Sequence, residues 1–181
     1  MTIQELIAKD VSFSESGFLA KVDNTYIMIL TSIMTENLKR VDHKVGDEVY
    51  QQLTEKLNNL QAQNSIQMYD ELNVKDSSIL SIEEKETYYE IKVKLISRYM
   101  DYQLDKTTRE YKSGNNRSRI EKNHILTFKK NKNATMEGMS RKCPGCGASI
   151  DANNSGVCPY CGTVYNTEDY DWVLTEIEGG V

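Results

Sequence analysis

The chain has 181 residues, of which 39% are hydrophobic and 27% charged, and its formal net charge is −5. This composition is typical of a globular protein that buries a core without disulfides. No apolar run approaches the roughly 20 residues of a membrane-spanning helix, and the first residues, MTIQELIAKD, lack the basic start and apolar block of a secretory signal. We therefore expect a cytoplasmic protein, with a peripheral position at the inner face of a membrane as the alternative.

The first half of the chain is predicted to be helical. Thr2 and Glu5 have the spacing of a capping box, which indicates a short helix. From Ser14 to about Arg40, apolar residues recur at steps of three and four, as on one face of a second helix: Phe18, Val22, Tyr26, Ile29, Ile33 and Met34. After a break at 42–46, a third helix is predicted to run to about Asn64 with one apolar face: Val49, Tyr50, Leu53, Leu57 and Leu60.

The second half is predicted to form antiparallel strands. Residues 65–83 contain short apolar alternations, and residues 87–104 alternate over more than the length of a typical strand. We therefore expect a bend or bulge near Ser97–Tyr99. The stretch Ser113-Gly114-Asn115-Asn116 predicts a turn, before a returning strand at 123–130. Helices followed by such strands indicate an α+β fold, with the helices on the concave side of a curved antiparallel sheet.

All four cysteines lie in one stretch, KCPGCGASIDANNSGVCPYCG, at residues 142–162. Cys143 and Cys146 form one Cys-x-x-Cys-Gly unit, and Cys158 and Cys161 form the other. Two such hairpins supply four thiolates in a tetrahedron, which suits one structural Zn²⁺. The alternatives are two disulfides, a thioredoxin-type redox pair or a rubredoxin-type iron centre. The two histidines, His43 and His124, are not needed as ligands.

The cysteine pattern and the loss of periodicity before it predict three parts. Residues 1–131 form a helix-plus-sheet domain, residues 132–142 a linker, and residues 143–181 a small zinc ribbon with a closing strand. Four residues give that strand one apolar face: Tyr170, Trp172, Leu174 and Ile177. Trp172 is expected to pack on the ribbon or against the first domain, and the alternative is an anchor for a partner.

The segment 98–142 is basic, whereas the residues on both sides of it are acidic. One interpretation is solvated strand faces, and another is a surface for acidic lipid at residues 112–132. Seven side chains would form that surface: Lys112, Arg117, Arg119, Lys122, Lys129, Lys130 and Lys132.

Several segments resemble the bacterial relatives of the mitochondrial inner-membrane translocase subunit 44. They are DEVYQQL, SRYMDYQLDKTTREYKSGNN and ILTFKK, and the cysteine segment is followed by YDWVL, as in several such bacterial proteins. The resemblance covers roughly residues 15–178. It implies a cone of the nuclear-transport-factor-2-like type with an apolar pocket. In the mitochondrial relative the domain scaffolds the import motor and contacts acidic lipid.

We predict a non-catalytic binding or scaffold module, linked to protein transport, whose apolar cone pocket holds a peptide, lipid or protein partner. A small cone-fold enzyme is one alternative, although no catalytic motif pairs its candidate residues: Asp70, Asp101, Asp105 and His124. A nucleic-acid-binding zinc-ribbon protein is the other alternative. It is disfavoured because no Lys or Arg follows Lys142.

Overall fold

The computed structural model describes residues 1–132, 140–142, 145–151, 158–162 and 171–181. The helical elements come first: α1 Ile3–Lys9, α2 Glu15–Met34, the 3₁₀ turn η1 Leu38–Arg40 and α3 Asp47–Ala62. Three long strands follow, β1 Ser65–Glu84, β2 Tyr88–Asp105 and β3 Tyr111–Asn131. The short strands are β4 Ser140–Lys142, β5 Ser149–Asp151 and β6 Val173–Ile177. This order confirms the predicted α+β class.

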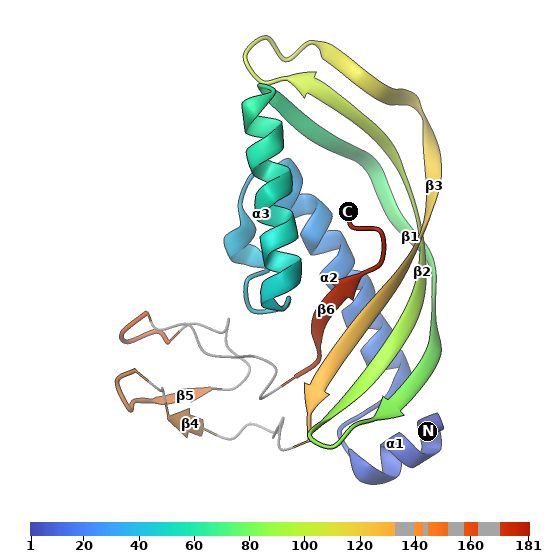
Figure 1. Ribbon diagram of the computed structural model, residues 1–181, viewed down its shortest axis with the longest axis vertical. Helices are drawn as coiled ribbons and strands as arrows, with labels where there is room; N and C mark the ends of the chain where they lie inside the picture. The colour runs from blue at the N-terminus through green and yellow to red at the C-terminus, as the bar shows by residue number, and fades with distance from the viewer. Residues whose placement is uncertain (133–139, 143–144, 152–157, 163–170) are drawn as a thin grey trace.

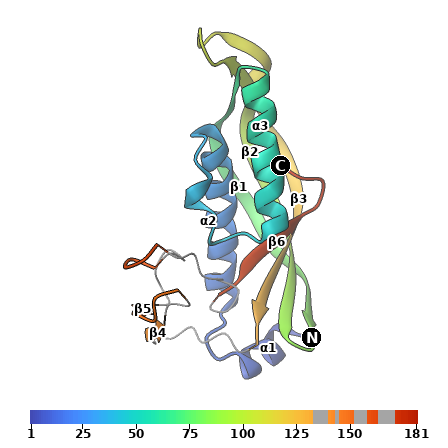
Figure 2. The ribbon, with the colours of Figure 1, turned by 60° about the vertical axis from the view of Figure 1, so that its left-hand side comes forward.

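The main sheet has the order β1-β2-β3-β6, and all its neighbours are antiparallel. It is strongly curved, with α2 and α3 on its concave face (Figures 1 and 2). Alternate residues of β2 face these helices, and Ile91, Val93 and Leu95 are completely buried. The predicted packing of helices inside a curved antiparallel sheet is therefore confirmed.

Local capping signals fix where the first helices begin. The Thr2 hydroxyl accepts from the Glu5 backbone N–H, and the Glu5 carboxylate accepts from the Thr2 N–H, which confirms the predicted capping box. Ser14 caps α2 by accepting from the Gly17 N–H.

The end of the second helix differs from the prediction. It ends at Met34 instead of near Arg40, because Glu36 has a φ of 53° that breaks the helical path. The chain then turns through η1, which places Leu38 and Val41 in the core. Burial of these two side chains outweighs continuation of the helix.

The predicted irregularity in the long second strand is confirmed. The register of β2 with β3 shifts between Tyr99 and Asp101. At the same level, the register of β1 with β2 shifts between Asp70 and Asn73. Paired strands of this length accumulate twist, and bulges at one level let both strands bend together.

The predicted turn at Ser113–Asn116 is wrong, because these residues lie inside β3. The hairpin instead turns at 106–109, where the Asp105 carboxylate accepts from the backbone N–H groups of Thr107 and Thr108, both at 2.9 Å. The Ser-Gly-Asn-Asn stretch leads into a wide bulge: Tyr99 pairs with Ile120 but Asp101 with Asn115. A turn-forming sequence here produces a bulge because an Asx turn has already reversed the chain.

Strand β6 was predicted to close the cysteine ribbon, but it pairs with β3 in the main sheet. Its other edge meets the residues before α3, where the Leu174 N–H donates to the Lys44 carbonyl at 3.0 Å. Trp172 is 7% exposed, and its ring packs against Phe13 and Phe18 at centroid distances of 6.0 and 5.1 Å. Packing against the first domain is therefore its role, and an exposed partner anchor is excluded.

The predicted linker at 132–142 lies mostly outside the described residues. Its last three residues, Ser140–Lys142, form β4, which pairs with β5 in a separate two-stranded sheet. Figure 1 shows this small hairpin apart from the main sheet. The division of the chain into domain, linker and ribbon stays a prediction.

Candidate functional site

The β4–β5 hairpin presents the first cysteine unit between its strands. Arg141 pairs with Ile150 and Lys142 with Ser149, so the chain must reverse between them. Gly147 follows Cys146 with a φ of 73°, a conformation that costs an L side chain about 1–2 kcal/mol. Cys143, the other predicted ligand of this unit, lies outside the described residues.

The second cysteine unit has a matching backbone. Gly162 follows Cys161 with a φ of 74°, and its N–H donates to the Cys158 carbonyl at 2.9 Å. This hydrogen bond closes a tight loop that holds Cys158 and Cys161 on one side. The sequence pattern Cys-x-x-Cys-Gly therefore has a physical reason, since glycine tolerates this φ immediately after the second thiol.

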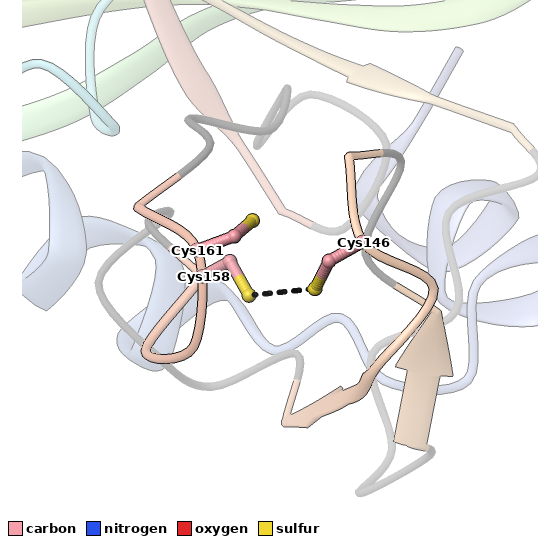
Figure 3. A group of neighbouring side chains, drawn as sticks. All are labelled: Cys146, Cys158 and Cys161. Atoms are coloured by element: carbon pink, nitrogen blue, oxygen red, sulfur yellow. Dashed lines mark hydrogen bonds between the residues drawn. The ribbon is translucent and has the colours of Figure 1, made fainter.

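The two units bring three sulfur atoms together (Figure 3). The Sγ atoms of Cys146, Cys158 and Cys161 all lie within 4.8 Å of one another. Cys146 Sγ and Cys158 Sγ are 3.8 Å apart, which is far longer than the roughly 2.05 Å of a disulfide bond. Four sulfurs bound tetrahedrally to zinc at about 2.3 Å would be about 3.8 Å from one another. The three thiols therefore fit a metal ion.

Burial of the thiols is uneven, since Cys158 is 1% exposed whereas Cys146 and Cys161 are exposed. Among the described residues, this group of candidate metal ligands contains no histidine. His43 instead contacts the Asp42 carboxylate at 3.3 Å. His124 lies on β3 beside the Tyr26 ring, and burial, with a smaller effect of Lys122, lowers its pKa.

The four residues considered for catalysis do not form one site. Asp105 caps the β2–β3 turn, and these backbone hydrogen bonds lower its pKa. Asp70 accepts from the Tyr102 hydroxyl, and this bond raises the pKa of Tyr102 to about 12. Asp101 accepts from the Gln67 amide at 2.7 Å. Because Asp101 pairs with Tyr69, the carboxylates of Asp70 and Asp101 point to opposite faces of the sheet.

The sequence did not reveal a buried polar cluster on the concave face. The Tyr26 hydroxyl and Ser97 Oγ are 2.8 Å apart and completely buried. Tyr69 and Tyr99 pack edge to face beside them at 5.2 Å. Burial raises the pKa of all three tyrosines. Tyr69 lies between Met68 and Asp70, and Tyr99 lies between Arg98 and Met100, so no regular polar–apolar alternation marked them as buried. Their pairing depends on strand register.

A cavity of about 370 Å³ opens between α3 and the main sheet. Its lining comes from α3 and its C-cap residue Gln63, from Gln103 on β2, and from Gly180 and Val181 after β6. The resemblance implied an apolar pocket, but most side chains of this cavity are amides or charged groups, and Leu60 and Val181 are the apolar ones. The expected apolar lining is therefore not found here, because α3 turns its apolar residues Val49 and Leu53 into the core.

The basic residues at 112–132 are divided between the two faces of the sheet. Lys122 pairs with Ser97 and Lys129 with Glu90, and these positions of β2 point in opposite directions. Lys130 is 3% exposed and donates to the Asp10 carboxylate. Alternation along β3 thus separates side chains that are neighbours in the sequence, and the acidic-lipid surface stays a prediction.

Comparison with known proteins places most of the chain in one family. A family model described as the Tim44-like domain matches residues 1–139. None of the curated proteins compared matches the chain. Within the part of the chain that the structure describes, no helix is long and apolar enough to cross a membrane.

Proposed function

The chain belongs to the Tim44-like domain family, and on that premise we propose that it is a non-catalytic binding module that serves protein transport. The match to the family model is the main observation behind this proposal. The cavity beside α3 supports it, because a binding module needs a concave surface for its partner. The structural partners of Asp70, Asp101 and Asp105 also favour binding over catalysis.

The partner in this proposal is a protein or peptide. Affinity capture from the native cell tests it, with a photo-crosslinking residue placed at Asn59 on the cavity wall of α3. The same crosslinker at Leu80, an exposed position on β1, is the control. We expect distinct proteins to be linked through position 59 and not through position 80. Absence of crosslinked protein from both positions would contradict a binding function.

The second part of the proposal is that Cys143, Cys146, Cys158 and Cys161 hold one structural Zn²⁺. The 3.8 Å separation of the Cys146 and Cys158 sulfurs supports it. A zinc ion with four sulfur ligands has no open position for water, so its role would be structural. Gly147 and Gly162 follow the second cysteine of each unit, and their positive φ angles permit the tight loops that direct the thiolates toward one another.

Metal analysis of the purified full chain tests the zinc site. We expect about one zinc per chain, and Cys158→Ser should lower this content strongly because it removes the buried sulfur. Tyr160→Ser is the matched control, since Tyr160 lies in the same loop and is 74% exposed. Equal zinc content in both variants, or iron in place of zinc, would refute the site.

A further inference from the structure

The two cysteine loops expose their thiols unequally. Cys146 and Cys161 are exposed, whereas Cys158 is 1% exposed, although it is not part of the core cluster of the curved domain. Oxidation of a cysteine by peroxide depends on access to the sulfur atom and on its thiolate form. An oxidant in solution therefore reaches Cys146 or Cys161 before it reaches Cys158.

Cys146 has a second sulfur atom within reach. Its Sγ lies 3.8 Å from Cys158 Sγ, and the two residues are 12 positions apart in the chain. A disulfide bond has a length of about 2.05 Å, so these sulfur atoms need to approach each other by about 1.8 Å. Redox-sensitive sites combine an exposed thiol with a neighbouring resolving thiol in this way.

The backbone after each thiol leaves room for this approach. A Cβ added at Gly147 or at Gly162 would have no atom within 4 Å. Glycine also has access to more backbone conformations than any other residue. Each loop is therefore bordered by open space at its glycine, and a movement of this size meets no packed neighbour there.

Cys161 is the competing partner for Cys158, because its sulfur atom also belongs to the group of three within 4.8 Å. A Cys158–Cys161 disulfide would join residues of one loop, whereas a Cys146–Cys158 disulfide joins the two loops. A disulfide that closes the longer loop restricts the unfolded chain more and is the more stable product in the chain-entropy description. This stability favours the bond between the loops.

We propose that Cys146 and Cys158 are a peroxide-reactive pair whose oxidation releases the zinc ion. The Cys146 sulfur attacks hydrogen peroxide and the O–O bond breaks, which leaves a sulfenic acid on Cys146 and, with one proton, a water molecule. The Cys158 sulfur then attacks the Cys146 sulfur, the S–O bond breaks, and the oxygen leaves with a second proton as water. Two thiolates, two protons and one peroxide thus give one disulfide and two waters.

This inference rests on the proposed zinc site and adds a modification that regulates it. The disulfide removes two of the four sulfur ligands, and the two that remain do not complete a structural zinc site. The curved domain should keep its fold, because β6 remains paired with β3. Oxidation would therefore change the cysteine loops and leave the main sheet intact.

Peptide mapping of the zinc-loaded full chain tests the pairing. Trypsin and Asp-N cut after Lys142 and before Asp151, so one peptide carries the first cysteine unit and another carries the second. After treatment with hydrogen peroxide, we expect the two peptides to be joined through Cys146 and Cys158, as assigned by fragmentation. About one zinc ion should be released per disulfide, and dithiothreitol with added Zn²⁺ should reverse both changes. A disulfide within either peptide, or irreversible sulfinic acid, would overturn the inference.

Two serine variants provide a matched pair, because each removes one exposed thiol. Cys161→Ser keeps both members of the proposed pair, and peroxide should still join its two peptides. Cys146→Ser removes the exposed member, and the joined product should be lost. Equal yields of joined peptides from the two variants would refute the assignment to Cys146.

Zinc content separates this inference from the zinc site itself. If zinc-loaded protein keeps its metal and its thiols in peroxide, the peroxide-reactive pair is refuted and the structural zinc site stands. If the purified full chain contains no zinc, the zinc site is refuted, and the inference that rests on it is refuted as well.

Discussion

The curved domain and the two cysteine loops, at 145–148 and 158–162, bury their side chains to different extents. Residues of the main sheet and helices share one core in which Tyr26, Phe128 and Leu174 are almost completely buried. In the two cysteine loops, Cys158 is the one buried residue among those whose exposure the structure describes. Segments this small do not fold on apolar burial alone and need a metal or disulfides. The first region therefore depends on packing, and we expect the second to depend on its thiols.

Metal removal gives the largest contrast between the regions. Chelation should abolish protection from hydrogen exchange at β4, β5 and 158–162, because structural zinc supplies about 10–16 kcal/mol in isolated fingers. Protection at α2, β3 and β6 should persist, since β6 pairs with β3. Exchange monitored by mass spectrometry checks both. Loss of protection in α2 would show that the domain needs the metal.

Truncation of a core side chain should destabilise the curved domain and spare the cysteine loops. Phe128 is 1% exposed, and its ring packs edge to face on Phe18 at 5.6 Å. Phe128→Ala should lower the free energy of unfolding by about 3–5 kcal/mol and leave zinc content unchanged. Tyr160→Ala, in the cysteine loop, should change the unfolding free energy by less than about 0.5 kcal/mol. Urea denaturation measures the unfolding free energy of both variants. Similar losses in the two variants would contradict the difference between the regions.

The buried ion pair between Lys130 and Asp10 gives a smaller, pH-dependent effect. Lys130→Met removes the ammonium group that donates to the Asp10 carboxylate. It should lower the free energy of unfolding by about 3 kcal/mol at neutral pH. This value is at the low end for such pairs because the Ser12 hydroxyl still contacts Asp10. Burial alone would raise the pKa of Asp10, but the hydrogen bonds from Lys130 and Ser12 outweigh it and lower the pKa.

Linkage fixes the sign of this pH dependence. A carboxyl whose pKa is lowered on folding stabilises the native state above its unfolded pKa of about 3.9, and the contribution is lost as pH falls through the folded pKa. The difference in unfolding free energy between wild type and Lys130→Met should therefore shrink as the pH falls below about 4 and through the lowered pKa of Asp10. Urea melts at several pH values check this, and a constant difference would contradict it.

A backbone substitution in the bulge has the smallest expected effect. Gly114 has a φ of 97°, and an added Cβ would lie 2.4 Å from the Asp101 carbonyl oxygen and 2.5 Å from Tyr102 Cα. Gly114→Ala should therefore lower the free energy of unfolding by about 2 kcal/mol. Gly180→Ala, with a φ of 71° and no atom within 4 Å, should cost about 1 kcal/mol. Thermal melts compare them, and equal costs would show that the bulge absorbs the methyl group.

Several elements could be predicted because their signals are local. The capping box at Thr2 and Glu5 and the apolar stripe of α2 depend on residues three or four apart, so neighbours along the chain determine them. The end of α2 could not be predicted in this way. It depends on Leu38 and Val41 reaching a core built largely from distant strands.

The candidate sites divide in the same way. The cysteine spacing predicted the close approach of Cys146, Cys158 and Cys161, because each loop fixes its own thiols. The cavity could not be predicted, since it joins α3, Gln103 and the segment after β6. The Ser-Gly-Asn-Asn stretch was misread as the hairpin turn because the competing Asp105 turn lies only a few residues earlier.

The sequence by itself determined the helix starts, the period of the long strands and the cysteine loops, since backbone conformation and short-range spacing control these features. The tertiary structure alone decided that β6 returns to the main sheet and that Lys130 is buried against Asp10, 120 residues away in the chain. It also decided that the concave cavity is polar. These features depend on which distant surfaces meet, and burial fixes that only when the whole chain folds.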